Sequence, residues 1–132
     1  MIPPWVLNSL VALLAFVVGG KFADVDLAPV FPLRHRSAWT HGPLVPALVW
    51  WVSTLHPLGW YVAVGFLPAY ALHLLADLWP KAWVGSALIK LYPLPLSFNP
   101  ALSFLWIALG VVAAWWVWWY PLEILTIIQR WL

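Results

Sequence analysis

The chain has 132 residues, of which 65% are hydrophobic and only 8% are charged. Soluble domains are about 25% charged, so this composition excludes an ordinary water-soluble fold and indicates a protein of the lipid bilayer. The chain has no cysteine, which excludes disulfides and thiolate metal sites, and its six basic residues give no support for nucleic-acid binding.

The first apolar run covers residues 5–22, and only Asn8 and Ser9 interrupt it. A run of about 18 apolar residues is long enough to cross a bilayer as a helix. A secretory signal would have Lys or Arg before its apolar run. None precedes this run, so we expect a retained membrane helix. Residues 23–42 then form a polar loop.

A second and a third span are predicted over residues 40–55 and 58–79, with the His56–Pro57 turn between them. Thr40 is a suitable N-cap for the second span. That span would be only about 24 Å long at 1.5 Å per residue. We therefore expect its first residues, including His41, to lie below the membrane surface.

Residues 80–100 contain four prolines (Pro80, Pro93, Pro95 and Pro100) and predict a loop that lies in the membrane interface. A fourth span is predicted over residues 101–120. Pro121 should end it and leave a short amphipathic tail over residues 122–132. The sequence therefore predicts one all-α domain over residues 1–132, an integral membrane four-helix bundle.

The basic residues predict how this bundle is oriented. Four spans place loops 23–42 and 80–100 on the same side of the membrane. All but one of the Lys and Arg residues lie on that side (Lys21, Arg34, Arg36, Lys81 and Lys90). The positive-inside rule makes these loops cytoplasmic and places both termini outside.

Carboxylates and imidazoles occur at three helix ends that this topology brings to one membrane face. Asp24 and Asp26 follow the first span, His41 opens the second, and His73 and Asp77 lie near the end of the third. The last two are four residues apart and share a helix face. Nitrogen and oxygen ligands suit Zn²⁺, Mn²⁺ or Fe²⁺, so we predict a site for one or two divalent ions. The alternative is a polar network in which every group is paired.

Arginines beside this cluster indicate a phosphate-containing substrate. Arg34 and Arg36 flank His35, and guanidinium groups bind phosphate oxygens as forks. A bound metal lowers the pKa of its water toward about 7. We therefore predict hydrolysis of a phosphoester, from a lipid headgroup or a small molecule, with Arg36 and Arg34 binding phosphate and His35 as general acid or base. Positive-inside anchoring is the simpler alternative for the two arginines.

Three motifs resemble known membrane families. Residues 19–26 (GGKFADVD) resemble the G-x-x-x-P-D-x-D segment of the YdjM-type inner-membrane metal-dependent hydrolases. Residues 35–43 (HRSAWTHGP) resemble the HRS-x-x-(S/T)-H-G-P motif of a sister family of uncharacterised metal-binding membrane proteins. Residues 73–77 (HLLAD) resemble their H-x-x-x-D. The resemblance implies a small helical protein of the inner membrane with a divalent metal site. Through more distant similarity to zinc-dependent phospholipase C, it also implies hydrolase chemistry.

Two positions depart from the family pattern. Asn8 stands at the place of a histidine early in the family's first helix, and Ala23 stands in place of its proline. An amide oxygen is a weak substitute for imidazole as a metal ligand. The first change would therefore remove one metal of a multi-metal site, or mark a copy that is no longer catalytic.

A second function from another class fits the thirteen tryptophans. The chain would then be a non-catalytic, Trp-rich membrane subunit of a larger complex that holds pigment, haem or quinone. A hydrolase requires His and Asp around one ion with an open water position, whereas a pigment subunit requires a single His in an apolar cleft. A transporter is disfavoured because no charged residue falls in the middle of a span.

Overall fold

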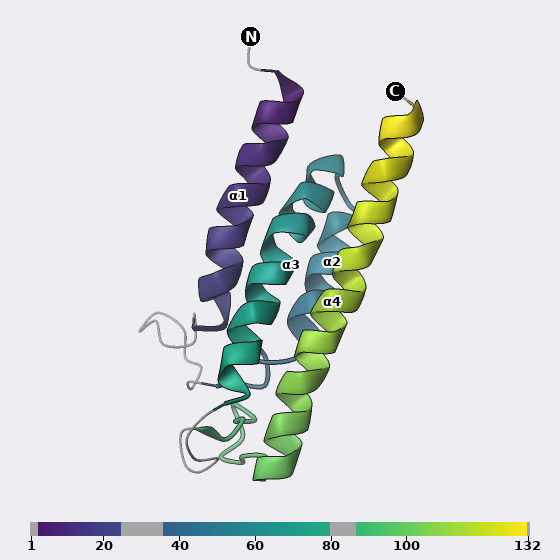
Figure 1. The fold of residues 1–132 in the computed structure, drawn as a ribbon. Coiled ribbons are helices and arrows are strands. Elements are labelled where there is room, and N and C mark those ends of the chain that lie inside the picture. The colour runs from purple at the N-terminus through teal and green to yellow at the C-terminus, as the bar shows by residue number, and fades with distance from the viewer. Residues whose placement is uncertain (1–2, 25–35, 80–86, 132) are drawn as a thin grey trace.

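A computed structural model describes residues 3–24, 36–79 and 87–131, and the side chains beyond Tyr120 lie outside that description. Within these residues the predicted all-α class is confirmed. Figure 1 shows the helices running alternately down and up, so both termini lie at one end and the loops that precede α2 and α4 lie at the other. We call the latter the loop end. The helices are α1 (Pro4–Phe22), α2 (Leu44–Ser53), α3 (Pro57–Asp77) and α4 (Pro100–Trp131).

Three of the four helices are long and apolar enough to cross a membrane: α1, α3 and the Pro100–Tyr120 part of α4. Their outer faces carry large hydrophobic side chains such as Leu13, Leu14 and Trp116, each more than half exposed. Such a surface is stable in acyl chains and aggregates in water. The helices therefore indicate a lipid bilayer as the surroundings of this protein.

The predicted second span is wrong in length. Over residues 40–55 only Leu44–Ser53 is α-helical, and ten residues reach about 15 Å, half of a hydrocarbon core of about 30 Å. The residues before it form a turn that is held by α3. Thr40 and Gly42 both bond through their backbone to the hydroxyl of Tyr70, and this tertiary contact is invisible to hydropathy.

The predicted C-terminal break at Pro121 is also wrong, because α4 continues through this proline to Trp131. A proline inside a helix removes one backbone hydrogen bond and usually bends the helix. Because only one bond is lost, the turns on both sides of Pro121 can stay helical. The backbone therefore forms one helix where we expected a separate tail.

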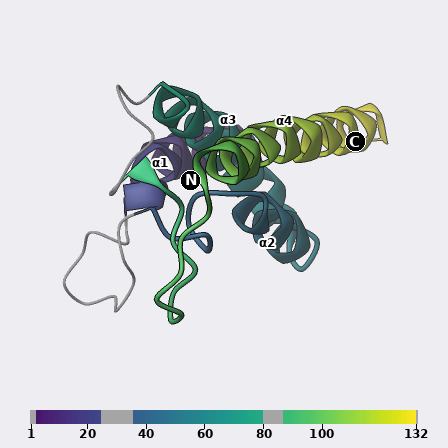
Figure 2. The same cartoon turned by 90° about the horizontal axis from the view of Figure 1, so that it is seen from below.

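Small residues bring α1 and α3 into close contact. Ala15 and Gly19 on α1 are buried, as are Gly65 and Ala69 on α3, and each pair has the small-xxx-small spacing of membrane helix interfaces. A Cβ atom on Gly65 would collide with the backbone of Ala12. Among the described helices α1 packs only against α3, while α3 also contacts α2 and α4, and Figure 2 shows α1 and α2 apart from each other.

The two described loop segments support each other at the loop end. Lys90 forms isolated bridges with Ser37 and with Ser97, and its backbone N–H donates to the carbonyl of Arg36 at 2.9 Å. From α4, the indole N–H of Trp106 donates to the carbonyl of Ala38 at 3.1 Å. The segment that leads into His41 is therefore fixed from two sides.

Candidate metal centre

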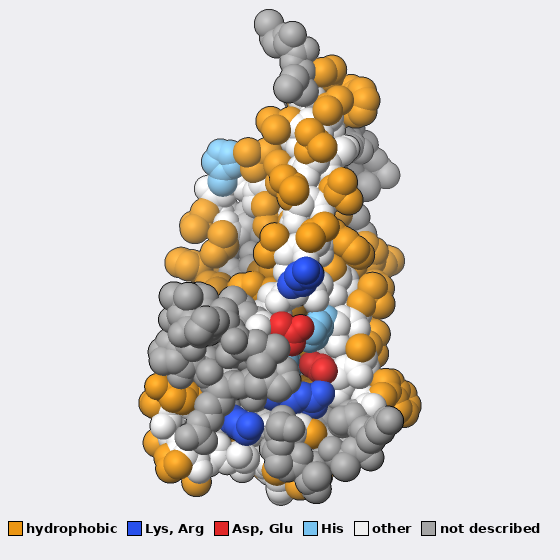
Figure 3. Space-filling view, turned by 90° about the vertical axis from the view of Figure 1, so that its left-hand side faces the viewer, with side chains coloured by type: hydrophobic (Ala, Val, Ile, Leu, Met, Phe, Trp, Pro, Cys, Tyr) orange, Lys and Arg blue, Asp and Glu red, His pale blue; other side chains and the backbone are white. Residues whose placement is uncertain are grey.

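Four of the predicted ligands meet at the loop end of the bundle. Asp24 lies just beyond the end of α1, and His41 lies in the turn before α2. His73 and Asp77 lie on the last turns of α3. On the face shown in Figure 3, acidic and histidine side chains reach the surface between two groups of Lys and Arg side chains, beneath a band of hydrophobic ones.

Several distances within this cluster are close to those between ligand atoms around a single ion. Nε2 of His41 and Nε2 of His73 each lie 3.4 Å from Oδ2 of Asp77. Nε2 of His73 also lies 3.7 Å from Oδ1 of Asp24. Around a tetrahedral Zn²⁺ with bonds of about 2.0–2.1 Å, neighbouring ligand atoms are about 3.3 Å apart. Asp24, His41 and His73 offer ligand atoms within 4.8 Å of one another, so this group could hold a metal ion.

Hydrogen bonds at the far side of each imidazole orient the rings. Nδ1 of His73 lies 3.0 Å from the carbonyl of Gly20, and a carbonyl only accepts, so Nδ1 carries the proton. Nδ1 of His41 lies 2.9 Å from Oγ1 of Thr40, whose own hydrogen points to the carbonyl of Ser37. With its proton on Nδ1, neutral His73 directs the Nε2 lone pair at the cluster, and His41 does the same when Nδ1 donates to Thr40; this is the tautomer of metal-ligating histidines.

Oδ2 of Asp77 is the centre of this arrangement. It is buried and, among the described residues, it has no hydrogen-bond partner. If both rings carried their proton on Nδ1, two neutral imidazoles and a carboxylate would present only lone pairs to one another, which is repulsive. A metal ion, or a proton on Nε2 of either ring, relieves this repulsion.

Arg36 holds the other oxygen of the same carboxylate. Its Nη2 donates to Oδ1 of Asp77 at 2.8 Å, and its Nη1 donates to the carbonyl of Ala87 at 3.1 Å. The residue is buried and has a φ of 58°, a left-handed conformation that is uncommon for a residue with a side chain. The structure thus places Arg36 as a residue that positions Asp77, and phosphate binding by Arg36 stays a prediction.

Tyr70 is a supporting residue that the sequence analysis missed. Its hydroxyl is fully buried and lies 2.8 Å from the carbonyl of Thr40 and 3.1 Å from the backbone N–H of Gly42. It thereby holds the turn that carries His41 against α3. The available signal was its position one turn before His73 on the same helix face.

The cluster is closed on one side and open on the other. The side chain of His41 is fully buried, those of His73 and Asp77 are 18% and 19% exposed, and that of Asp24 is 45% exposed. Solvent or a substrate can therefore approach from the side of Asp24.

The remaining predicted residues are not part of the described cluster. Asp26, Arg34 and His35 lie outside the described residues. Asn8 is described, but it lies fourteen residues before the end of α1, about 21 Å along the helix. An imidazole at this position would therefore not reach the cluster. The presence of Asn8 in place of a histidine thus takes no ligand away from the cluster.

Comparisons of the chain with known protein families, with curated proteins and with solved structures found no match. The class of protein is therefore defined by the fold and the cluster alone. Over the described residues it is all-helical, with three helices that could cross a membrane and with an Asp/His/His group at one end that could hold a metal ion.

Proposed function

We propose that this protein is a divalent-metal-dependent hydrolase of the inner membrane that acts on a phosphoester at the cytoplasmic interface. The observation that carries the proposal is the convergence of two imidazole Nε2 atoms on the same oxygen of Asp77, each at 3.4 Å. The resemblance of residues 19–77 to the YdjM-type hydrolases supports the same function.

Each described residue of the cluster has a distinct task in this proposal. His41, His73 and Asp77 hold the ion from the buried side, and Asp24 completes the set at the exposed side. Zn²⁺ suits the distances, and Mn²⁺ or Fe²⁺ would accept the same ligands. When bound, such an ion supplies a nucleophile at neutral pH and polarises a phosphoryl oxygen.

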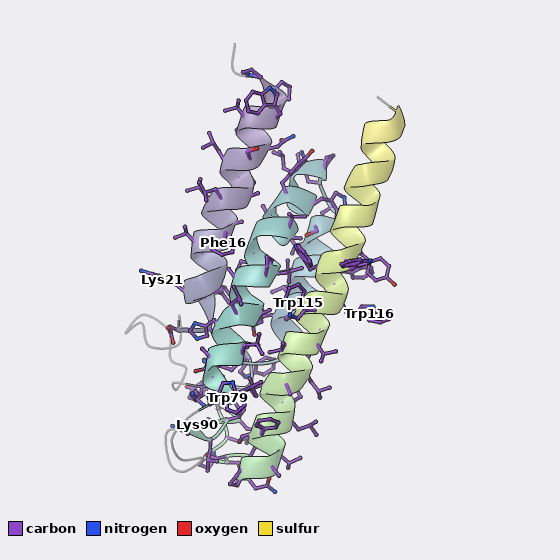
Figure 4. The ribbon with its side chains drawn as sticks, viewed as in Figure 1. Phe16, Lys21, Trp79, Lys90, Trp115 and Trp116 are labelled. Carbon is purple, nitrogen blue, oxygen red and sulfur yellow. The ribbon has the colours of Figure 1, made fainter. Side chains whose placement is uncertain are left out.

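The charge around the cluster suits an anionic substrate. Lys21 extends from the end of α1, and Lys90 lies in the loop below (Figure 4). Ammonium groups on both sides attract phosphate oxygens toward the open side of the cluster. In the reaction a water oxygen bonds to phosphorus, the ester P–O bond breaks, and the alcohol leaves with a proton from that water.

The test begins with the metal content of the purified protein. We expect wild type, reconstituted in nanodiscs with Zn²⁺ and washed, to retain metal, and His73→Ala and His41→Ala to retain little. His56→Ala is the matched control, because His56 caps the opposite end of α3. Equal and negligible metal in all four proteins would refute the metal site. Wild type that holds metal but releases no phosphate or alcohol from phosphoesters would refute the hydrolase alone.

A second candidate function rests on a different surface. Trp115, Trp116, Trp119 and Tyr120 of α4 line an open hollow of about 530 Å³ together with Val112, and Trp116 points away from the bundle in Figure 4. This surface fits the non-catalytic subunit of a pigment, haem or quinone complex. A visible or near-ultraviolet absorption band that co-purifies with wild type and is lost in Trp116→Ala would support it.

A further inference from the structure

A shallow hollow lies directly beside the His/Asp cluster, on the outer side of the α1–α3 pair. It has a volume of about 330 Å³ and is lined by Phe16, Gly20, Ala69, Leu72 and His73. Four of these five residues are apolar, and the fifth is a proposed metal ligand. The hollow thus joins an apolar surface inside the two membrane-spanning helices to the polar cluster at their ends.

The register of the two helices gives the hollow its direction. The carbonyl of Gly20 accepts from His73, so these two residues lie at the same level. Phe16 and Ala69 each lie four residues earlier on their helices, about 6 Å deeper into the span. The hollow therefore runs from the cluster toward the middle of the membrane, along the direction in which an acyl chain lies.

A missing side chain keeps this hollow open. A Cβ atom on Gly20 would meet only the Cβ of Ala69, at 3.9 Å, which is ordinary contact. A Cβ on the neighbouring Gly19 would collide with the backbone of Phe66. Packing between the helices thus explains the glycine at 19, whereas it leaves the glycine at 20 without a packing requirement.

From this geometry we infer that the hollow binds the first part of the hydrocarbon chain of a membrane lipid whose phosphate reaches the His/Asp cluster. The apolar walls match the chain, and Lys21 at the end of α1, together with a bound divalent ion, would match an anionic headgroup. A volume near 300 Å³ is at the lower end for a ligand site, so it suits one chain. The inference rests on the proposed metal-dependent function and names its substrate class: a phosphoester lipid that enters sideways from the bilayer.

Photocrosslinking in nanodiscs tests this inference. The probes are phosphatidic acid and diacylglycerol, each with a diazirine near the start of one acyl chain, and crosslinked residues are identified by peptide mass spectrometry. With Zn²⁺ present, we expect phosphatidic acid to label Phe16 and Leu72 several-fold more than Trp116 on α4, and a chelator to reduce that excess. Diacylglycerol should label the hollow more weakly and independently of Zn²⁺.

The variant Gly20→Leu fills the hollow, and Val18→Leu is the matched control on the exposed face of the same helix. We expect Gly20→Leu to abolish the excess labelling and Val18→Leu to retain it. If Gly20→Leu fails to fold, Leu72→Trp fills the hollow from α3, where Leu72 is 54% exposed. Labelling at the level of Trp116, or labelling that survives the filling variants, would overturn the inference.

Failure of the proposed metal site can be distinguished from failure of the lipid inference. It would appear as absence of retained Zn²⁺ in the wild-type protein. Labelling by diacylglycerol does not depend on the metal, so it would still report whether a chain occupies the hollow. A Zn²⁺-binding protein whose hollow is labelled no more than α4 would leave the metal site standing and overturn the lipid inference.

Discussion

The hydroxyl of Tyr70 lies 2.8 Å from the carbonyl of Thr40, and this contact joins the helix of His73 to the turn of His41. The two histidines are 32 residues apart in the sequence, and their rings lie 6.1 Å apart, centre to centre. The position of one proposed ligand relative to the other thus depends on a tyrosine that contacts neither metal nor substrate.

Removing that hydroxyl should loosen the cluster. Tyr70→Phe leaves the carbonyl of Thr40 and the N–H of Gly42 without this partner in a buried place, which costs about 1–3 kcal/mol. We expect a lower thermal unfolding temperature in detergent and weaker Zn²⁺ retention. Tyr61→Phe on the same helix is the control, because the structure records no hydrogen bond of the Tyr61 hydroxyl within the described residues. Equal effects of both variants would contradict this role of Tyr70.

The two neighbouring glycines of α1 should respond differently to substitution by alanine. Gly19→Ala places a methyl group against the backbone of Phe66, whereas Gly20→Ala meets only a side-chain methyl at 3.9 Å. Overpacking costs about 1–3 kcal/mol, and here it would also push Asp24 away from His73. We expect Gly19→Ala to lower both the unfolding temperature and Zn²⁺ retention, and Gly20→Ala to match wild type. The opposite order would show that α1 and α3 do not pack as described.

The two carboxylates of the cluster should differ in their contribution to stability. Asp77 pairs with the buried guanidinium of Arg36 at 2.8 Å, and breaking such a pair by removing one charge costs about 3–5 kcal/mol. Asp24 is nearly half exposed. We therefore expect Asp77→Asn to lower both stability and metal retention, and Asp24→Asn to lower metal retention while leaving the unfolding temperature nearly unchanged. Chemical or thermal unfolding of the metal-free proteins separates a contribution to folding stability from a contribution to metal binding.

Metal should stabilise the folded protein. Free Zn²⁺ at one hundred times its dissociation constant adds about 2.7 kcal/mol when it binds only the folded state. We expect the unfolding temperature of wild type to rise with Zn²⁺ and to return with a chelator. His41→Ala should show no rise, and His56→Ala should respond like wild type. A Zn²⁺-dependent rise of equal size in His41→Ala would place the binding elsewhere.

Much of the candidate site could be predicted from the sequence because two of its determinants are local. Hydropathy marks where apolar helices begin and end, and alternation of direction then fixes which ends share a membrane face. This was sufficient to expect Asp24, His41, His73 and Asp77 in one layer, and the structure brings these four together. The four-residue spacing of His73 and Asp77 on one helix face follows from helical geometry alone.

The two errors in helix bounds have different physical causes. The span over residues 40–55 was too long because Thr40 and Gly42 bond to Tyr70 of α3, and the helix therefore starts later. The break at Pro121 did not occur because a proline removes a single backbone bond from a long helix. Phosphate binding by Arg36 stays a prediction, and the structure adds that its guanidinium contacts Asp77 and Ala87.

The sequence by itself determined the apolar helices, their alternating directions and the membrane face on which acids and histidines would gather, because hydropathy and helical spacing act between near neighbours in the chain. Only the tertiary structure decided which atoms face each other: Nδ1 of each imidazole lies toward an oxygen atom, Nε2 lies toward Asp77, and an open hollow lies beside His73. This side-chain arrangement depends on hydrogen bonds and close packing between segments that are dozens of residues apart, and such contacts leave no periodic pattern in the sequence.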